Sequence, residues 1–196
     1  MSIKRDLELM YELGSLRLID RTWRQLHVPA AANTTEHCFR VIWLALMLAK
    51  QVDETVNEEL LLKMALVHDV TETRTGDVNW VSRQYNDRKE EQAIHDTLAG
   101  TSLTEYEELR ASYEQRDTIE AKLVKDADTL DFDLEIMEQA AQVRDSLEGN
   151  RRSNVRSHMY TEAAQKFQDA IYGSNPHDWY TQSQVSHTVG DQSGAS

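Results

Sequence analysis

Glycine and proline are scarce in the first 172 residues of this 196-residue chain. That part contains four glycines and one proline, whereas the last 24 residues hold three glycines and Pro176. A hairpin-rich β fold needs residues with positive φ at short intervals, and glycine supplies most of them. The scarcity therefore predicts an all-α fold, with long helices joined by few turns and no sheet. The length is consistent with one domain over residues 1–172 and a disordered tail over residues 173–196.

Hydropathy and cysteine content exclude several classes of protein. The longest unbroken apolar run, residues 41–49, is too short for a membrane-spanning helix, which needs about 20 residues. The N-terminal segment is acidic and amphipathic and lacks the apolar stretch of a signal peptide. The single cysteine, Cys38, forbids an internal disulfide and a zinc site built from cysteines. These features predict a cytoplasmic protein without a membrane partner.

The chain is strongly acidic, with 34 acidic and 21 basic residues and a formal net charge of −13. Stable binding to nucleic acid is disfavoured, because it depends on lysine and arginine neutralising the phosphates. A small phosphate-bearing ligand is compatible with this charge where a metal ion or local arginines reverse the field. We therefore expect any phosphate site in this chain to contain a cation.

Apolar residues at helical spacing and polar capping residues place the helices along the chain. The first is predicted at residues 3–20, with Gly14 as a bend or break. The others are predicted at about residues 35–51, 58–69, 88–98, 103–115, 118–149 and 155–171. Their starts are assigned from residues that can accept a backbone N–H, namely Thr34 or Thr35, Asn57, Asp87 or its neighbours, Ser102 with Glu105, and Asp117 with Glu120.

Three of the seven histidines are followed by aspartate, so this dipeptide by itself carries little information. His95-Asp96 lies in a charged helix and is interpreted as part of a solvated face. His68-Asp69 differs because it ends a nearly continuous apolar run, LLLKMALV. Polar side chains at the end of a buried helix need partners, and metal coordination would supply them. Glu72 follows at helical spacing, so a helix would direct all three side chains into one cavity.

Two further segments offer ligands of the same chemistry. His37 lies in the first turn of an apolar helix, directly after its predicted cap. The segment KLVKDADTLDFDLE has an apolar stripe that places Asp128 at the edge of the buried face and Asp126 and Asp133 farther out. Two nitrogen and two oxygen donors suit a first-row divalent ion with open positions for water and substrate. The alternative is that each is a polar residue satisfied at a helix end. The candidate ligand set is His37, His68, Asp69 and Asp128.

The order of three motifs resembles the HD-domain phosphohydrolase superfamily. The motifs are TEH at residues 35–37, HDVTETRTGD at residues 68–77 and KDADTL at residues 125–130. Similarity extends upstream to LGSLRLIDRTW at residues 13–23. The likeness is to the small single-domain branch that includes the bacterial 5′-deoxynucleotidases. It implies an HD-domain helical bundle, a hydrolase of nucleotide metabolism and a homodimer.

The resemblance also implies roles for individual residues. One divalent metal ion (Co, Mn, Mg, Zn, Ni or Fe) would be bound by the H…HD…D motif. Glu72 would be a catalytic acid or base, and Asp77 would act in catalysis or substrate contact. Arg21 resembles the arginine that contacts the phosphate, and Trp23 is an approximate counterpart of the aromatic residue that follows it, since Thr22 intervenes. The implied metal ligands are His37, His68, Asp69 and Asp128.

The favoured function is a metal-dependent phosphohydrolase that releases phosphate from (deoxy)nucleoside 5′-monophosphates by means of a metal-activated water. One alternative is a deoxynucleoside triphosphate triphosphohydrolase of the same fold. It would need more basic residues near the pocket, and the candidates are Arg21, Arg74, Arg83 and Arg88. A second alternative is a non-catalytic nucleotide-binding module. The presence of both proposed acid–base residues argues against the second alternative.

Overall fold

The computed structural model describes residues 2–26, 28, 31–139 and 152–181. Within these residues the secondary structure is helical, apart from an isolated antiparallel bridge between Asp20 and Asn33. The predicted all-α fold is therefore confirmed. The predicted break at Gly14 is also confirmed, because the first helix ends there and a 3-10 turn follows.

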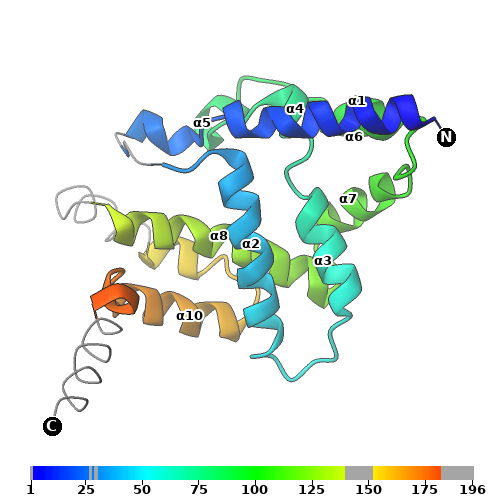
Figure 1. Cartoon of the computed structure of the whole chain (residues 1–196). Helices are drawn as coiled ribbons and strands as arrows, with labels where there is room; N and C mark the ends of the chain where they lie inside the picture. Colours follow the sequence, from blue (N-terminus) through cyan, green and yellow to red (C-terminus); the bar gives the residue numbers. More distant parts are fainter. Residues whose placement is uncertain (1, 27, 29–30, 140–151, 182–196) are drawn as a thin grey trace, which may run out of the picture.

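Figure 1 shows the arrangement of the helices. In chain order they are α1 Ile3–Gly14, the 3-10 turns η1 Ser15–Leu18 and η2 Thr22–Leu26, α2 Thr34–Ala49, α3 Glu58–Val67, α4 Glu72–Thr75, α5 Trp80–Arg83, α6 Glu90–Leu98, α7 Tyr106–Gln115, α8 Ile119–Glu138 and α10 Glu162–Tyr172.

The main hydrophobic core surrounds α8. Helices α2, α3, α7 and α10 all pack against it (Figure 1). Burying one large apolar side chain in such a core contributes about 1.5–3 kcal/mol, so this packing fixes the helices relative to one another. The fully buried apolar side chains include Val41, Leu48, Leu61, Met64, Leu123, Leu130 and Ile136. Helices α2, α3 and α8 are also the elements on which the candidate ligands were predicted.

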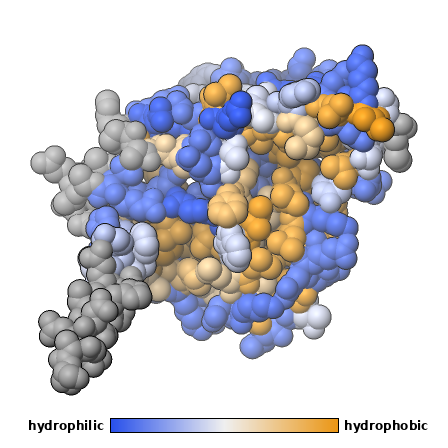
Figure 2. All heavy atoms as spheres, viewed as in Figure 1, coloured by the Kyte–Doolittle hydropathy of each residue, from blue (hydrophilic) through white to orange (hydrophobic). Residues whose placement is uncertain are grey.

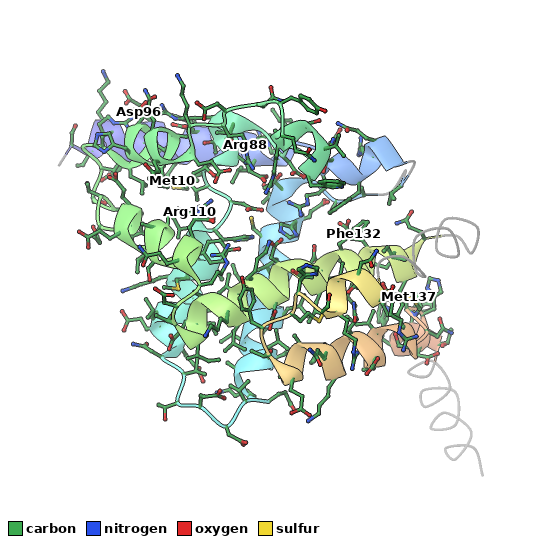
Figure 3. All side chains as sticks on the ribbon, turned by 180° about the vertical axis from the view of Figure 1, so that it is seen from behind. Met10, Arg88, Asp96, Arg110, Phe132 and Met137 are labelled. Carbon is green, nitrogen blue, oxygen red and sulfur yellow. The ribbon has the colours of Figure 1, made fainter. Side chains whose placement is uncertain are left out.

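A second layer, formed by α1 and α6, covers the segment between α3 and α4. The two helices lie side by side in Figure 1 and, from behind, in Figure 3. Arg5 of α1 ties them together, since its Nε donates to the carbonyl oxygen of Ala99 at 3.1 Å. This layer packs directly on the chain that flanks His68 and Asp69. Its apolar cluster comprises Leu9, Ile94, Leu98, Val67 and Val70.

Two of the predicted helix caps are displaced by one residue. Asn33, rather than Thr34 or Thr35, caps α2 in a reciprocal capping box with Glu36. Thr34 is instead fully buried. Thr118 rather than Asp117 caps α8. The predicted Asn57 cap of α3 is confirmed.

The predicted capping box of α7 is wrong, and the start of α6 lies near the predicted residue. Neither Ser102 nor Glu105 caps α7, which begins at Tyr106 without a side-chain cap. Helix α6 begins three residues after Asp87, whose carboxylate accepts from the backbone N–H of Lys89.

The aspartates of α8 are more buried than predicted. Asp126 accepts hydrogen bonds from the backbone N–H and the hydroxyl of Thr161, and Asp133 accepts from Gln168 and Tyr172. The expectation that Asp126 and Asp133 lie farther out is therefore wrong. The reason is that α10 covers the face of α8 opposite α2, so these carboxylates face another helix instead of water.

The C-terminal helices are shorter than predicted. Helix α8 ends at Glu138, before the predicted end near residue 149, and residues 140–151 lie outside the described part. The helix predicted at residues 155–171 is divided into a short helix at 152–156 and α10, because Thr161 is extended and caps α10. Residues 178–181 form a further helical turn, and residues 182–196 lie outside the described part. The domain boundary at residue 172 stays a prediction.

Apolar side chains are also exposed on the surface of α2. They form a stripe at a spacing of four residues, comprising Phe39, Trp43 and Met47. Figure 2 shows apolar atoms gathered on the face of the molecule where α2 and α3 lie in Figure 1. Among the described helices, none combines the length and the hydropathy that crossing a bilayer requires.

Candidate metal centre and active site

Four polar side chains converge from three helices. His37 lies in the first turn of α2, His68 directly follows α3, Asp69 comes next, and Asp128 lies in the middle of α8. One donor atom from each lies within 4.8 Å of the others. Both histidines are fully buried and the two aspartates partly so. The structure therefore brings together the whole predicted ligand set.

The spacing of the four donor atoms suits a single ion. Nε2 of His37 lies 3.2 Å from Oδ1 of Asp128 and 3.4 Å from Oδ2 of Asp69. Nε2 of His68 lies 3.4 Å from the same Oδ2 and 3.4 Å from Nε2 of His37. Donors bound at about 2.0–2.2 Å to one ion stand about 3–3.5 Å apart at neighbouring positions.

The partners of the two histidines direct their lone pairs into the cluster. Nδ1 of His68 lies 2.7 Å from the carbonyl oxygen of Ala65, which accepts only, so this nitrogen carries the proton. Nδ1 of His37 lies 2.6 Å from Oδ2 of Asp131. When both Nε2 atoms are unprotonated, as metal binding requires, their lone pairs face each other at 3.4 Å. A cation between them relieves that repulsion, so the donor set fits a divalent metal ion.

The electrostatics of the cluster also favour a cation. Burial and Arg21 both oppose a charge on His37, yet the hydrogen bonds that its ring donates to carboxylates such as Asp128 outweigh them and raise its pKa well above the usual value. Burial lowers the pKa of His68. The pKa values of Asp69 and Asp128 are lowered, because neighbouring basic groups outweigh the opposing effect of burial. In the metal-free site, two ionised carboxylates therefore face a protonated His37 and a neutral His68, and a metal ion would take the place of the proton on Nε2 of His37.

Arg21 lies against this cluster, with its side chain 9 % exposed. Its Nη1 is 3.4 Å from Oδ2 of Asp69 and 3.6 Å from Oδ2 of Asp77, and its Nη2 is 3.9 Å from Oδ1 of Asp128. Burial opposes its charge, but the three carboxylates outweigh burial and raise the pKa of Arg21 above its usual value. Arg21 thus places a permanent positive charge beside the candidate ligands.

The turn before Asp77 depends on Gly76. Its φ of 68° lies in the region that favours glycine, so the chain can turn sharply between Thr75 and Asp77. The turn brings Asp77 to within 3.6 Å of Arg21, and its Oδ2 accepts from the backbone N–H of Thr22 at 3.0 Å. Arg88 holds the turn from the other side, where its Nη2 donates to the carbonyl oxygen of Gly76 at 3.4 Å.

Glu72 reaches the same buried site by a different route from the predicted one. Helix α3 ends at Val67, and the chain tightens so that the N–H of Glu72 donates to the carbonyl oxygen of Asp69. The Glu72 side chain is nevertheless buried and accepts a hydrogen bond from Oγ1 of Thr34 at 3.1 Å. Burial, together with the charges of Asp69 and Asp77, raises the pKa of Glu72 to about 8.

Trp23 lies two residues after Arg21 in the sequence, and one face of its ring is covered by another aromatic ring. The ring stacks on Phe132 of α8, with centroids 3.8 Å apart and an interplanar angle of 18°. Residue Phe132 is labelled in Figure 3. This packing links η2 to α8. Substrate contact by Trp23 stays a prediction.

Sequence reasoning assigned no site role to three residues that contact the ligands. Lys125 donates to Oδ2 of Asp128 at 2.7 Å, and Asp131 lies 2.6 Å from His37. Tyr113 packs edge-on against the ring of His68. Lys125 and Asp131 could have been predicted from the sequence, because they lie three residues before and three residues after Asp128 and so share its face of a helix. Tyr113 comes from a separate helix, and no local pattern indicates it.

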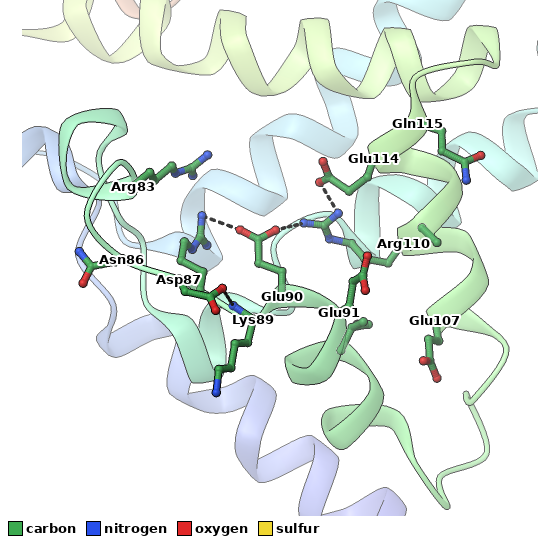
Figure 4. Close-up of a pocket in the computed structure, with 13 residues that line it drawn as sticks. Arg83, Asn86, Asp87, Lys89, Glu90, Glu91, Glu107, Arg110, Glu114 and Gln115 are labelled. Atoms are coloured by element: carbon green, nitrogen blue, oxygen red, sulfur yellow. Dashed lines mark hydrogen bonds and ion pairs between the residues drawn. The ribbon is translucent and has the colours of Figure 1, made fainter.

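A cavity of about 850 Å³ lies between residues 83–91 and α7 (Figure 4). None of the four candidate ligands lines it. Its central charges neutralise one another, since Glu90 bridges Arg88 and Arg110, and Arg110 also pairs with Glu114. Figure 3 shows Arg88 and Arg110 from behind. We therefore assign the chemistry to the buried His–Asp cluster rather than to this cavity.

Comparison with known proteins places this geometry in a family. Residues 13–171 match the HD domain family. The protein named 5′-deoxynucleotidase HDDC2 from Danio rerio is 33% identical over 133 residues, which span 64% of this chain and 65% of that protein. The human protein of the same name is 28% identical over 139 residues, which span 67% of each chain.

Solved structures show the same architecture. A conserved hypothetical protein from Pyrococcus furiosus superposes with a TM-score of 0.71 at 25% identity, covering 86% of this chain and 99% of that one. The HD phosphohydrolase DatZ of cyanophage S-2L, bound to dA and one catalytic Zn²⁺ ion, superposes with a TM-score of 0.55 at 21% identity, covering 84% and 96%. The motif order, the convergent His–Asp cluster and the match over residues 13–171 lead to one conclusion: the chain belongs to the HD-domain family.

Proposed function

We propose that the protein is a metal-dependent 5′-deoxynucleotidase that releases phosphate from (deoxy)nucleoside 5′-monophosphates. The observation that carries the proposal is the convergence of the four-residue donor set with Arg21 and Glu72 in one buried site. The name shared by the similar vertebrate proteins supports the substrate class. We also infer that the enzyme works in the cytoplasm.

The donor set defines what the metal would contribute. His37, His68, Asp69 and Asp128 would hold one divalent ion, of which Co, Mn, Mg, Zn, Ni and Fe are candidates. When bound, such an ion lowers the pKa of a coordinated water and offsets charge on a phosphoryl oxygen. The remaining contributions come from side chains of this chain.

Arg21 would bind and orient the phosphate. Its guanidinium is buried and held by three carboxylates, so it is fixed before substrate arrives. A planar guanidinium can donate two parallel hydrogen bonds to a phosphate. Asp77 would set the direction of Arg21 and could contact the sugar, since its own position is fixed by the N–H of Thr22.

Glu72 would transfer a proton from the attacking water or to the leaving oxygen. A pKa of about 8 means that both protonation states are populated near neutral pH, which suits a general acid or base. Its hydrogen bond from Thr34 holds one carboxyl oxygen in place within the buried site. The choice between taking a proton from water and giving one to the leaving oxygen is left open.

The charge of the site favours a monophosphate over a triphosphate. With Glu72 protonated, the carboxylates of Asp69, Asp77 and Asp128 oppose Arg21, Lys125 and a divalent ion, which leaves a formal charge of about +1. Such a site balances about half of the charge of a phosphate dianion. A triphosphate carries more charge and would need additional free cations.

The other arginines predicted for a triphosphate are engaged elsewhere. Arg74 pairs with Glu12 on α1 through its Nε at 2.6 Å. Arg88 pairs with Glu90, and Nε of Arg83 donates to the carbonyl oxygen of Val78 at 2.7 Å. These contacts support the monophosphate proposal.

A product-resolved assay tests the function. Purified protein is stripped of metal, given Co²⁺, Mn²⁺, Mg²⁺ or Zn²⁺, and incubated with deoxynucleoside mono- and triphosphates. We expect orthophosphate from monophosphates with at least one metal, and loss of that activity in Asp69→Ala. Asp96→Ala is the matched control, because Asp96 also follows a histidine but is largely exposed. Triphosphate as product would favour the alternative hydrolase, and calorimetric binding of nucleotide without turnover would favour a non-catalytic module.

We also propose a homodimer that pairs through the exposed stripe on α2. Phe39 and Trp43 pack edge to face, and Met47 extends the stripe, so a two-fold axis would bury the same apolar side chains from both copies. Trp43→Glu should convert a dimer into a monomer in sedimentation or light-scattering experiments. Tyr85→Glu, at another exposed aromatic residue, is the control. A wild-type monomer at micromolar concentration would reject this proposal.

A further inference from the structure

Asp131 lies directly behind one of the candidate ligands. Its Oδ2 is 2.6 Å from Nδ1 of His37, the ring nitrogen that faces away from the cluster. Its Oδ1 accepts a hydrogen bond from Nε of Arg40, also at 2.6 Å. The side chain is 2 % exposed. Both carboxylate oxygens are therefore engaged, one by the histidine and one by an arginine.

A buried carboxylate destabilises the folded protein unless a countercharge pairs with it, so Asp131 needs a cationic partner. Arg40 supplies the countercharge and is itself held by Glu138, to which its Nη1 donates at 2.8 Å. Arg40 comes from α2 and Asp131 from α8, like His37 and Asp128 respectively. The contact thus joins the two helices at the point where their ligands meet.

We propose that Asp131 is a positioning residue for the metal centre, and that Arg40 positions Asp131 in turn. This inference rests on the proposed function. Asp131 fixes the proton of His37 on Nδ1, turns the Nε2 lone pair toward Asp69 and Asp128, and increases the electron density at that nitrogen. A carboxylate behind a ligating imidazole orients the ring and strengthens metal binding in this way.

The second histidine is held differently, which makes the proposal specific to His37. Nδ1 of His68 meets the backbone carbonyl oxygen of Ala65, a neutral acceptor. Of the two Nδ1 partners, the one at His37 is a charged side chain and can therefore be changed by substitution. We expect changes at Asp131 to act on metal affinity.

Asp133 provides a matched control for a general effect of removing a buried acid. It lies two residues farther along α8, is as fully buried as Asp131, and also accepts two side-chain hydrogen bonds. Its partners are Gln168 and Tyr172, outside the candidate ligand set. A role in folding alone predicts similar behaviour for Asp131→Asn and Asp133→Asn, whereas positioning predicts a difference in metal binding.

The test measures metal binding to the apoprotein, without nucleotide. Zn²⁺ and Co²⁺ affinities are determined by competition with a chromogenic chelator for wild type, Asp131→Asn and Asp133→Asn. We expect a 10–100-fold weaker Kd for Asp131→Asn and a change below about threefold for Asp133→Asn. An asparagine can donate to Nδ1 and drive the histidine proton to Nε2, so nitrogen NMR of His37 should report the other tautomer in Asp131→Asn.

A second variant keeps the test decisive if Asp131→Asn does not fold. Arg40→Gln removes the countercharge from a partly exposed position and should weaken metal binding by a smaller factor than Asp131→Asn in the same assay. Unchanged metal affinity in a folded Asp131→Asn, or in Arg40→Gln when the first does not fold, overturns the positioning role and leaves the proposed function intact. Absence of metal binding in wild type would overturn the proposed function itself.

Discussion

The hydroxyl of Thr34 donates a hydrogen bond to Oε2 of Glu72 at 3.1 Å in a buried site where the pKa of Glu72 is raised to about 8. Thr34 is the first residue of α2, and Glu72 is the first residue of α4. The contact therefore holds an ionisable carboxyl group at a fixed place beside the metal ligands. It also explains why Thr34 does not cap its own helix.

Replacing Glu72 by glutamine should separate proton transfer from metal binding. Glutamine keeps the size and can still accept from Thr34, but it cannot exchange a proton at neutral pH. We expect kcat to fall by about 10²–10⁴-fold while metal affinity changes by less than about fivefold. Glu120→Gln serves as control, because Glu120 is a buried glutamate that binds the backbone of Asn57 away from the site. Full activity in Glu72→Gln would remove Glu72 from the mechanism.

The raised pKa of Glu72 should also make the stability of the metal-free protein depend on pH. Between its usual pKa of 4.5 and the folded value of about 8, the folded state holds a proton that the unfolded state has lost. Stability from this group is therefore fully present below about pH 4.5 and is lost as the pH rises through about 8. The loss is on the order of 5 kcal/mol for a shift of this size. Urea unfolding in EDTA at pH 5, 7 and 9 measures it, and the wild-type decline should be reduced in Glu72→Gln.

The fold class followed from sequence because it depends on residue frequencies, whereas the helix starts depended on competing contacts. Few glycines and prolines are enough to predict an all-α fold. The displaced caps are different, because the side chain of Thr34 is used by Glu72 and that of Glu120 by Asn57. Both partners are far away in sequence, so the local pattern could not indicate them.

In the candidate site, too, some features could be predicted from the local sequence and others depend on contacts between distant segments. His68 and His95 occur in the same dipeptide, and their surroundings separated them: His68 is fully buried, and the side chain of His95 is 61% exposed. The convergence of the ligand set could be predicted from motif order and helical spacing. The pairing of Asp131 with His37, and the burial of Asp133 under α10, required the packing of whole helices.

Gly76 should be sensitive to substitution because of its backbone alone. An added Cβ would meet nothing within 4 Å, but φ is 68°. Alanine there should cost about 1–2 kcal/mol of stability and should lower kcat/KM, since the turn sets the position of Asp77. Gly14→Ala is the control, because Gly14 has helical φ of −60° and equal free space, so alanine should be neutral or stabilising. Equal unfolding free energies for the two variants would contradict this account.

Arg21 should contribute to substrate binding while opposing metal binding. Its guanidinium lies within 4 Å of two candidate ligands, so removing its charge should leave metal affinity unchanged or increase it. Arg21→Met should nevertheless reduce kcat/KM for a monophosphate by about 10²–10³-fold, and Arg21→Lys should restore little because it lacks the planar pair of donors. Arg24→Met, at an exposed arginine of η2 that pairs with Asp20, should leave both quantities unchanged. Parallel loss of metal and substrate binding in Arg21→Met would show that Arg21 is structural.

Removing the metal should destabilise the protein, because Asp69 and Asp128 then face each other across a buried site with two histidines and Arg21. Binding to the folded state alone adds about 2.7 kcal/mol when free metal is 100 times its Kd. Tm should therefore fall on addition of EDTA and recover with Zn²⁺ or Mn²⁺. In Asp69→Asn one donor charge is lost, so the metal-dependent part of Tm should shrink, while the metal-free protein should be as stable as wild type or more so because the repulsion is relieved. A Tm that is indifferent to EDTA in wild type would count against a metal at this cluster.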